Sequence, residues 1–198
     1  MYPPSMPVRI LRLAGGSGLR SRRAKTPSTA LMVVFEDYDP SYPAVFQRLV
    51  SAVRAVLGDV RLEHVGSTSV PGLGGQRVID AVIMQSDPGR RCWITTTLLR
   101  QGGFSMSSWG WLAPTLTCTI SLARKSYPVL LYVLAEDHPV LRGWLACRDY
   151  WRAHPDEAAH YAVIKRYAIA AGHIYPWTYH QAKSPYLKRL AEQLDVPP

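Results

Sequence analysis

The spacing of hydrophobic and polar positions along the chain predicts its secondary structure. Residues 41–57 carry apolar side chains three and four positions apart, which is typical of a helix with one buried face. Short apolar or alternating runs predict strands, and later stretches predict further helices. The predicted strands are 31–35, 60–65, 78–83, 104–109, 115–124 and 127–135, and the further helices are 90–100, 138–153, 155–171 and 177–194, the last broken or bent near Pro185. This order predicts an α+β domain with a mixed β-sheet and a helical C-terminal cap.

Residues 1–30 show little periodicity and differ from the rest in charge. They contain six basic and no acidic residues, so they supply +6 of the net charge of +9, and the other 17 basic and 14 acidic residues nearly balance. We interpret residues 1–30 as a mostly disordered basic arm and residues 31–198 as a single domain. The arm could be an upstream start-site extension, an anion-binding arm or a targeting segment. We expect no contact with nucleic acid except through this arm.

The composition, 47% hydrophobic and 19% charged, is that of a globular protein. The three cysteines are scattered and form no CxxC pair, which argues against a disulfide framework or a zinc site and fits a reducing cytosol. No apolar run approaches the length needed to span a membrane. We expect a cytoplasmic protein without a membrane contact. The alanine-, arginine- and proline-rich sequence is compatible with a bacterium of high GC content.

A glycine-rich stretch joins the predicted strands 60–65 and 78–83. It contains Gly66, Ser67 and Thr68, which offer backbone N–H groups and hydroxyls suited to binding an anion. Such a stretch is most often only a turn. The next strand, however, carries Asp80 inside an apolar run, and burying an unpaired carboxylate costs several kcal/mol. We therefore expect Asp80 to have a partner such as a cation, a metal or a group of donors.

The run from His64 to Leu73, HVGSTSVPGL, followed by Val-Ile-Asp at 78–80, resembles the signature of the GrpB family. These small proteins resemble the nucleotidyltransferase superfamily and are sometimes fused to a dephospho-CoA kinase. The resemblance covers about residues 31–194 and continues at further positions. These are Tyr38-Asp39-Pro40, Tyr42-Pro43, Arg148-Asp149-Tyr150, His154-Pro155, Tyr161, Lys165, Tyr179 and Lys183.

The resemblance implies a nucleotidyltransferase-like fold and the location of a site. Gly66, Ser67 and Thr68 would hold the phosphates of a nucleoside triphosphate, and Asp80 would bind Mg²⁺. Four cationic residues would point into the cleft toward an anionic substrate that carries a phosphate or a carboxylate. These are Arg77, Arg148, Lys165 and Lys183.

Three departures from the family pattern bear on the chemistry. Val82 stands where the superfamily usually has a second acid, and Gln76-Arg77 replaces a common Lys-Pro. The late strand reads Val-Leu-Leu-Tyr at 129–132 where members usually show a run like His-His-Leu-His. The departures leave His64, Tyr132 and Asp80 as the acid–base candidates, with His64 favoured by its near-neutral pKa.

Three functions remain open from the sequence. The first is a divergent nucleotidyltransferase-fold enzyme that binds an anionic small molecule and transfers a nucleotidyl group. The second is a metal-independent tailoring or cyclising enzyme of specialised metabolism that reuses the same cleft. The third is a non-catalytic ligand-binding or regulatory module. A homo-oligomer is compatible with each.

Overall fold

The computed structural model describes residues 10–11, 32–107 and 115–197, and within them one mixed sheet organises the domain. Its strands are β1 (Ile10–Leu11), β2 (Leu62–Val65), β3 (Ile79–Met84), β4 (Ser105–Met106), β5 (Thr115–Leu122) and β6 (Lys125–Leu134). The order is β1-β5-β6-β3-β2, and β4 pairs with β5. The β3–β6 and β1–β5 pairs are parallel and the others antiparallel. The expected α+β class with a mixed sheet is confirmed.

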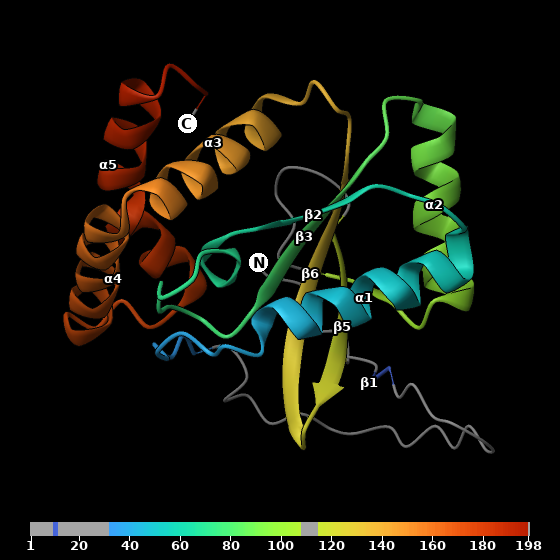
Figure 1. Ribbon diagram of the computed structural model, residues 1–198, viewed down its shortest axis with the longest axis horizontal. Helices are drawn as coiled ribbons and strands as arrows, with labels where there is room; N and C mark the ends of the chain where they lie inside the picture. Colours follow the sequence, from blue (N-terminus) through green and yellow to red (C-terminus); the bar gives the residue numbers. More distant parts are fainter. Residues whose placement is uncertain (1–9, 12–31, 108–114, 198) are drawn as a thin grey trace, which may run out of the picture.

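Within the described part of the chain, five α-helices accompany the sheet (Figure 1). Helices α1 (Tyr42–Leu57) and α2 (Pro88–Gln101) lie apart from the three C-terminal helices, α3 (Pro139–Ala153), α4 (Pro155–Ala170) and α5 (Pro176–Gln193). Each begins with a proline at its first or second position, where the missing N–H has no partner to lose. The C-terminal helices form the expected cap.

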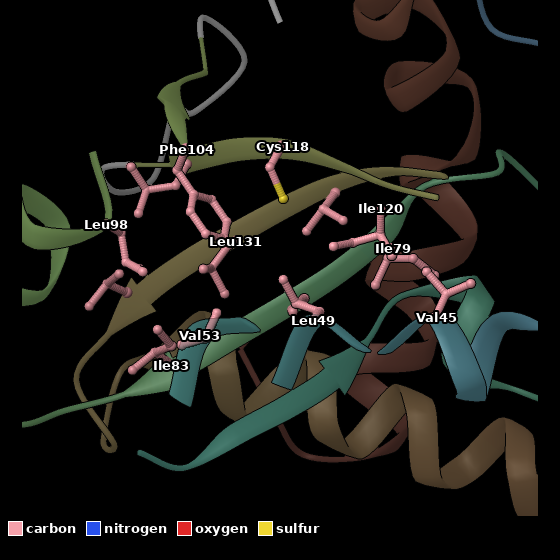
Figure 2. Close-up of a cluster of buried hydrophobic side chains, with 14 of the residues drawn as sticks. Val45, Leu49, Val53, Ile79, Ile83, Leu98, Phe104, Cys118, Ile120 and Leu131 are labelled. Carbon is pink, nitrogen blue, oxygen red and sulfur yellow. The ribbon is translucent and has the colours of Figure 1, made fainter. Parts of the chain in front are cut away.

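The alternation along β3 divides the sheet into two faces. Ile79 and Ile83 point into the main core, where they pack with Val45 and Leu49 of α1 (Figure 2). The residues between them point to the opposite face. There Val82 packs in a second cluster with side chains of β6 and α3. Because Asp80 shares this second face, its carboxylate lies on the side of the C-terminal helices.

The prediction of a strand at residues 31–35 is wrong for the residues described. Residues 32–35 form no strand, and Glu36 alone makes a bridge, with its N–H and C=O both 2.8 Å from the backbone of Gly75. The Val33 N–H instead donates to the Ile174 carbonyl at 2.6 Å, and the Val33 side chain packs against Tyr179. Of the apolar side chains at 32–34, Val33 is buried against α4 and α5, whereas Met32 and Val34 are exposed.

Other boundaries also differ from expectation. The two described residues of the basic arm, Ile10 and Leu11, pair in parallel with Thr119 and Ile120 of β5. Helix α5 continues through Pro185 without a break. The strand expected at 104–109 is limited to β4 in the described part, and residues 108–109 lie outside it. No helix of the described residues is long and apolar enough to cross a membrane.

Candidate functional site

The glycine-rich stretch lies directly against the acid of β3. Gly66 adopts φ 70° and ψ −176°, a conformation that side-chain-bearing residues rarely adopt, and a Cβ there would collide with the Asp80 carboxylate. The turn that follows, the 3-10 helix η2 (Ser67–Ser69), is closed by hydrogen bonds from Ser69 Oγ to the Gly66 carbonyl (2.6 Å) and from the Val70 N–H to the Ser67 carbonyl (3.1 Å). Glycine is thus required here by both backbone and space.

Gly74 and Gly75 lie against the side chain of Lys165, which reaches the glycine-rich loop from helix α4. A Cβ on Gly75 would lie 2.8 Å from both Ser67 Oγ and Lys165 Nζ, so these two polar atoms flank one glycine. Lys165 Nζ also donates to the Gly74 carbonyl. The Lys165 side chain is 2% exposed, and its ammonium lies over the Tyr161 ring, 4.7 Å from the centroid. A lysine far along the chain therefore reaches into the glycine-rich loop.

Lys183 of α5 completes the group, which we call the Asp80 cluster: Ser67, Asp80, Tyr132, Lys165, Tyr179 and Lys183. Burial raises the pKa of Asp80 to about 7, against the attraction of Lys183, which lowers it. Burial lowers the pKa of Lys183 to about 8, although Asp80 raises it. The pKa of Lys165 falls well below its usual value through burial and the nearby charge of Lys183. These groups titrate as a coupled set.

Several polar atoms of the Asp80 cluster have no protein partner. Within residues 32–107 and 115–197, nothing donates a hydrogen bond to the Asp80 carboxylate or accepts one from Lys183 Nζ. The Tyr179 hydroxyl is buried and equally unpaired, while its ring carries Lys183 Nζ 4.5 Å from the centroid. Buried polar groups are nearly always hydrogen-bonded, and the Tyr179 hydroxyl is an exception. Asp80 and Lys183, which are partly exposed, also lack a protein partner, and the three groups together indicate a binding site.

Tyr132 contributes a hydroxyl on the same face. It pairs with Val82 across the β3–β6 ladder, and its ring packs edge-on against Trp144, with the centroids 4.8 Å apart. Burial, reinforced by the negative charge of Asp80, raises the pKa of Tyr132 above its ordinary value. The hydroxyl therefore stays protonated and can act as a donor.

His64 and Thr68 lie on the other face of the sheet. His64 pairs with Ala81, so its ring points toward α1, where it stacks on Phe46 with the centroids 4.7 Å apart. Its Nε2 is 3.0 Å from Thr68 Oγ1, which donates to the Val78 carbonyl. Burial lowers the pKa of His64 to about 3. The structure does not bring His64 or Thr68 to Asp80.

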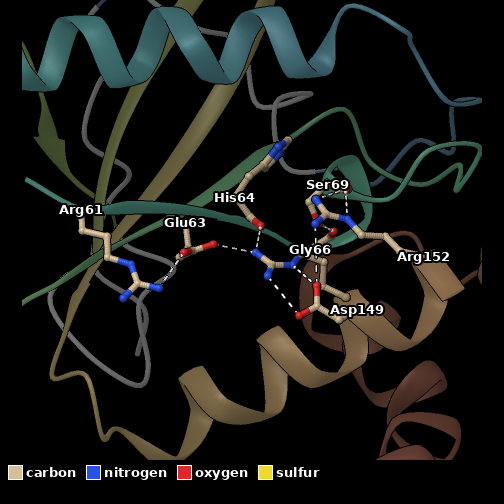
Figure 3. Close-up of polar contacts among 8 residues, drawn as sticks. Arg61, Glu63, His64, Gly66, Ser69, Asp149 and Arg152 are labelled. Carbon is tan, nitrogen blue, oxygen red and sulfur yellow. Dashed lines mark hydrogen bonds and ion pairs between the residues drawn. The ribbon is translucent and has the colours of Figure 1, made fainter.

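Arg77 and Arg148, two of the four cationic residues expected in the cleft, also lie away from the Asp80 cluster. Arg77 lies beside Glu36, with Nε 3.5 Å from the carboxylate. Arg148 Nη1 is 2.8 Å from Glu63 Oε2 and 3.0 Å from the His64 carbonyl, and its Nε is 2.7 Å from Asp149 Oδ1 (Figure 3). Arg148 thus joins α3 to the edge strand β2, and its charge is already balanced.

A groove of about 730 Å³ runs along that edge, between the start of α1 and the end of α3. Its walls include Tyr38, Phe46 and Trp151. Arg152 lines it as well and donates to the Ser69 carbonyl from Nε and Nη2 at 3.0 and 2.7 Å (Figure 3). The sequence did not predict a role for Arg152. Its position one helical turn after Arg148 indicates that the two arginines share a face of the helix.

Comparison with known proteins agrees with the sequence signature. The family described as GrpB protein matches residues 32–193. The chain belongs to the GrpB family. The UPF0157 protein BH1888 of Halalkalibacterium halodurans is 29% identical over 143 residues, which cover 71% of this chain and 70% of that protein. The UPF0157 protein SCO7215 of Streptomyces coelicolor is also 29% identical, over 78% of this chain and 80% of its own length.

A solved member has the same fold as this GrpB chain. The crystal structure of the conserved protein GrpB from Enterococcus faecalis superposes with a TM-score of 0.65, covering 81% of this chain and 96% of that one. The sequences are 22% identical over this superposition, so the likeness concerns the fold. This superposition is consistent with an α+β fold that has a nucleotidyltransferase-like sheet.

The side chains of the Asp80 cluster fit a Mg²⁺ site poorly. Among the described residues, no three His, Cys, Asp or Glu side chains come together as metal ligands. Asp80 is the only carboxylate of the Asp80 cluster, and its charged neighbour is the ammonium of Lys183. Mg²⁺ sites are built from carboxylates and phosphates with open octahedral positions. A cluster of one acid and two amines is better suited to an anion.

Proposed function

We propose that this GrpB protein binds a small molecule carrying a phosphate or carboxylate at the Asp80 cluster. The observation that carries the proposal is the gathering of three polar groups without protein partners: the buried Tyr179 hydroxyl and the partly exposed Asp80 and Lys183. Buried donors and acceptors lacking partners cost about 1–3 kcal/mol each, a cost that a ligand with matching atoms removes. The unpaired groups therefore favour a binding role over a purely structural one.

The sign of the charge favours an anion. When all three groups are ionised, Lys165 and Lys183 outnumber Asp80, and burial lowers the pKa values of both lysines. A bound phosphate or carboxylate supplies the missing negative charge, and Ser67 and the backbone of the glycine-rich loop add neutral donors. The geometry of Lys165, Ser67 and Gly75 around one point supports this assignment.

The chemistry best matched to these residues is acid–base catalysis without a metal ion. Asp80, with a pKa of about 7, and Lys183, with a pKa of about 8, can each exchange a proton near neutrality. The Tyr132 hydroxyl adds a donor on the same face. This narrows the proposal of a tailoring or cyclising enzyme to Asp80, Lys183 and Tyr132, without His64. Nucleotidyl transfer from a nucleoside triphosphate with Mg²⁺ is the alternative, favoured by the family resemblance to nucleotidyltransferases.

Thermal unfolding distinguishes metal-independent anion binding from Mg²⁺-dependent nucleotidyl transfer. The purified protein would be heated with inorganic phosphate, nucleoside triphosphates or 2-oxo and amino acids, each with Mg²⁺ and with EDTA. A ligand at 100 times its Kd adds about 2.7 kcal/mol, which raises Tm by roughly 5–10 °C for a chain of this size. We expect stabilisation by an anion that EDTA does not remove, and a dependence on Mg²⁺ would favour nucleotidyl transfer.

Variants decide whether the Asp80 cluster is the site. Lys183→Met should abolish the anion-dependent shift, whereas Lys188→Met, on the exposed side of the same helix, should leave it unchanged. The proposal is overturned if no anion stabilises the protein, or if Lys183→Met responds as the wild type does.

A further inference from the structure

The two lysines of the Asp80 cluster differ in what their amines contact. Lys165 Nζ is fixed by the Gly74 carbonyl, and its side chain is 2% exposed. Lys183 Nζ has no hydrogen-bond acceptor among the described residues, and its side chain keeps partial exposure. One amine is therefore held by the loop, and the other is free to meet a ligand.

The surroundings of Lys183 are those of a reactive amine. Its Nζ lies 4.5 Å from the centre of the Tyr179 ring. The opposite charge of Asp80 raises the pKa of Lys183, but burial lowers it more. A lysine that is desolvated loses its proton readily, and the neutral amine is a nucleophile. At neutral pH the fraction of neutral amine at Lys183 far exceeds that of an ordinary lysine, because the pKa of Lys183 is lowered to about 8.

We propose that Lys183 forms an imine with the carbonyl carbon of an acidic substrate, such as an aldehyde or 2-oxo acid. This rests on the proposed function, because the acid group of the same molecule would be bound beside Lys165. The free amine of Lys183, the unpaired carboxyl of Asp80 and the Lys165 amine held by the Gly74 carbonyl give the three parts that the reaction needs.

The steps balance without an oxidant or reductant. The Lys183 lone pair attacks the carbonyl carbon, the C–N bond forms, and the carbonyl oxygen takes up the proton that nitrogen releases, giving a carbinolamine. Asp80 in its acid form then protonates the departing hydroxyl, and water leaves as nitrogen forms the C=N bond. The proton that nitrogen loses at this stage returns to Asp80, so the net reaction is amine plus carbonyl giving imine plus water.

Reductive trapping tests this directly. The full-length protein would be incubated with saturating pyruvate or glyoxylate and treated with sodium borohydride, which converts an imine into a stable secondary amine. Intact mass would count the adducts and peptide mapping would locate them. We expect one adduct on Lys183, formed at least tenfold faster at pH 7 than on any exposed lysine. Its rate should rise with pH and level off above about 8, the pKa of Lys183.

Variants separate this reaction from anion binding. Lys183→Arg keeps the positive charge but lacks a nucleophilic amine, so it should still be stabilised by the acid while losing the adduct. Lys188→Met should keep both. Adducts spread evenly over exposed lysines overturn the proposal. So does binding of either acid to the wild type without an adduct, which leaves the anion site standing. If neither acid stabilises the wild type and neither gives an adduct, the imine is overturned, and the panel of other anions separately decides the proposed function.

Discussion

Gly66 lies so close to Asp80 that the two residues constrain each other. Gly66→Ala should lower the free energy of unfolding for two reasons: a strained backbone, about 1–3 kcal/mol, and the collision of the new Cβ with the Asp80 carboxylate, about 1–3 kcal/mol more. Gly58 is a matched control, since its φ of 76° and ψ of −153° are similar and nothing lies within 4 Å of its Cβ position. Urea denaturation would compare the two.

The collision part of this prediction has its own control. Gly66→Ala combined with Asp80→Ala removes the carboxylate that the new Cβ meets and leaves only the Cβ of residue 80, at 3.2 Å. The double variant should therefore recover most of the difference from Gly58→Ala. Equal losses for Gly66→Ala and Gly58→Ala would show that the close approach to Asp80 does not matter.

Asp80 should also leave a signature in the pH dependence of stability. Its pKa is about 7 in the folded protein against the ordinary value of 3.8 in the unfolded chain, so the folded state holds the proton more tightly. The contribution of Asp80 is thus fully present below about pH 3.8 and is lost as the pH rises through about 7. Asp80→Asn should remove this loss, roughly 4 kcal/mol, from the unfolding free energies measured between pH 4 and 8.

The control for Asp80→Asn is Asp59→Asn, because the Asp59 side chain is 93% exposed. That variant should keep the wild-type slope with pH. If the unfolding free energy of Asp80→Asn changed with pH as in the wild type, the Asp80 carboxylate would be solvated in the folded protein. Asp80 would then no longer support the proposed binding site.

The sequence predicted some of these residues better than others. Asp80 was recognisable as an acid in an apolar strand. The glycine-rich stretch before it predicted a loop that binds an anion. The separation of His64 from Asp80 also followed from the alternation of β2 against β3, since His64 pairs with Ala81 and Val65 with Asp80. What periodicity could not supply was how far Lys165 and Lys183 reach, because that depends on the packing of helices α4 and α5.

At the scale of elements, the sequence pattern found the helices and most strands. It assigned residues 31–35 to a strand, but among the described residues Val33 packs against helices while Met32 and Val34 are exposed, so this short apolar run did not mark a strand. It also expected α5 to be broken or bent near Pro185, and the helix is not broken there. Proline removes one N–H from the helix, but tertiary packing of Tyr186 and Leu190 holds the following turn in place.

Arg148 fastens helix α3 to the edge of the sheet, and this can be tested. Its side chain is 12% exposed and binds Glu63, the His64 carbonyl and Asp149. Arg148→Met should destabilise the protein by about 1–3 kcal/mol, because Glu63 and a backbone carbonyl lose a charged donor. Arg142→Met, on an exposed position of the same helix, should change stability by less than about 0.5 kcal/mol.

The readout for Arg148→Met includes hydrogen exchange as well as denaturation. The amides of β2 should exchange faster than in the wild type, while those of the central strand β6 should not. A loss of stability no larger than that of Arg142→Met would mean that this half-buried ion pair contributes nothing net, as many do.

At the scale of the whole molecule, the family match and the charge divide the chain at the same point. The GrpB match begins at residue 32, and residues 1–31 hold six basic and no acidic side chains. Their described contact with the domain is the pairing of Ile10 and Leu11 with β5, at the edge of the sheet away from the Asp80 cluster. The domain should therefore fold and bind its anion without them.

A chain of residues 32–198 should unfold cooperatively, with a loss of about 1–2 kcal/mol from the missing ladder hydrogen bonds. It should retain the full anion-dependent rise in Tm. Its net charge falls from +9 to +3, since six basic residues are removed and none of the 14 acids. Any binding to duplex DNA, measured by fluorescence anisotropy at two salt concentrations, should accordingly weaken and lose its salt dependence. If the anion-dependent shift disappeared with the arm while unfolding stayed cooperative, the arm would belong to the binding site, and the Asp80 cluster alone would not explain the function.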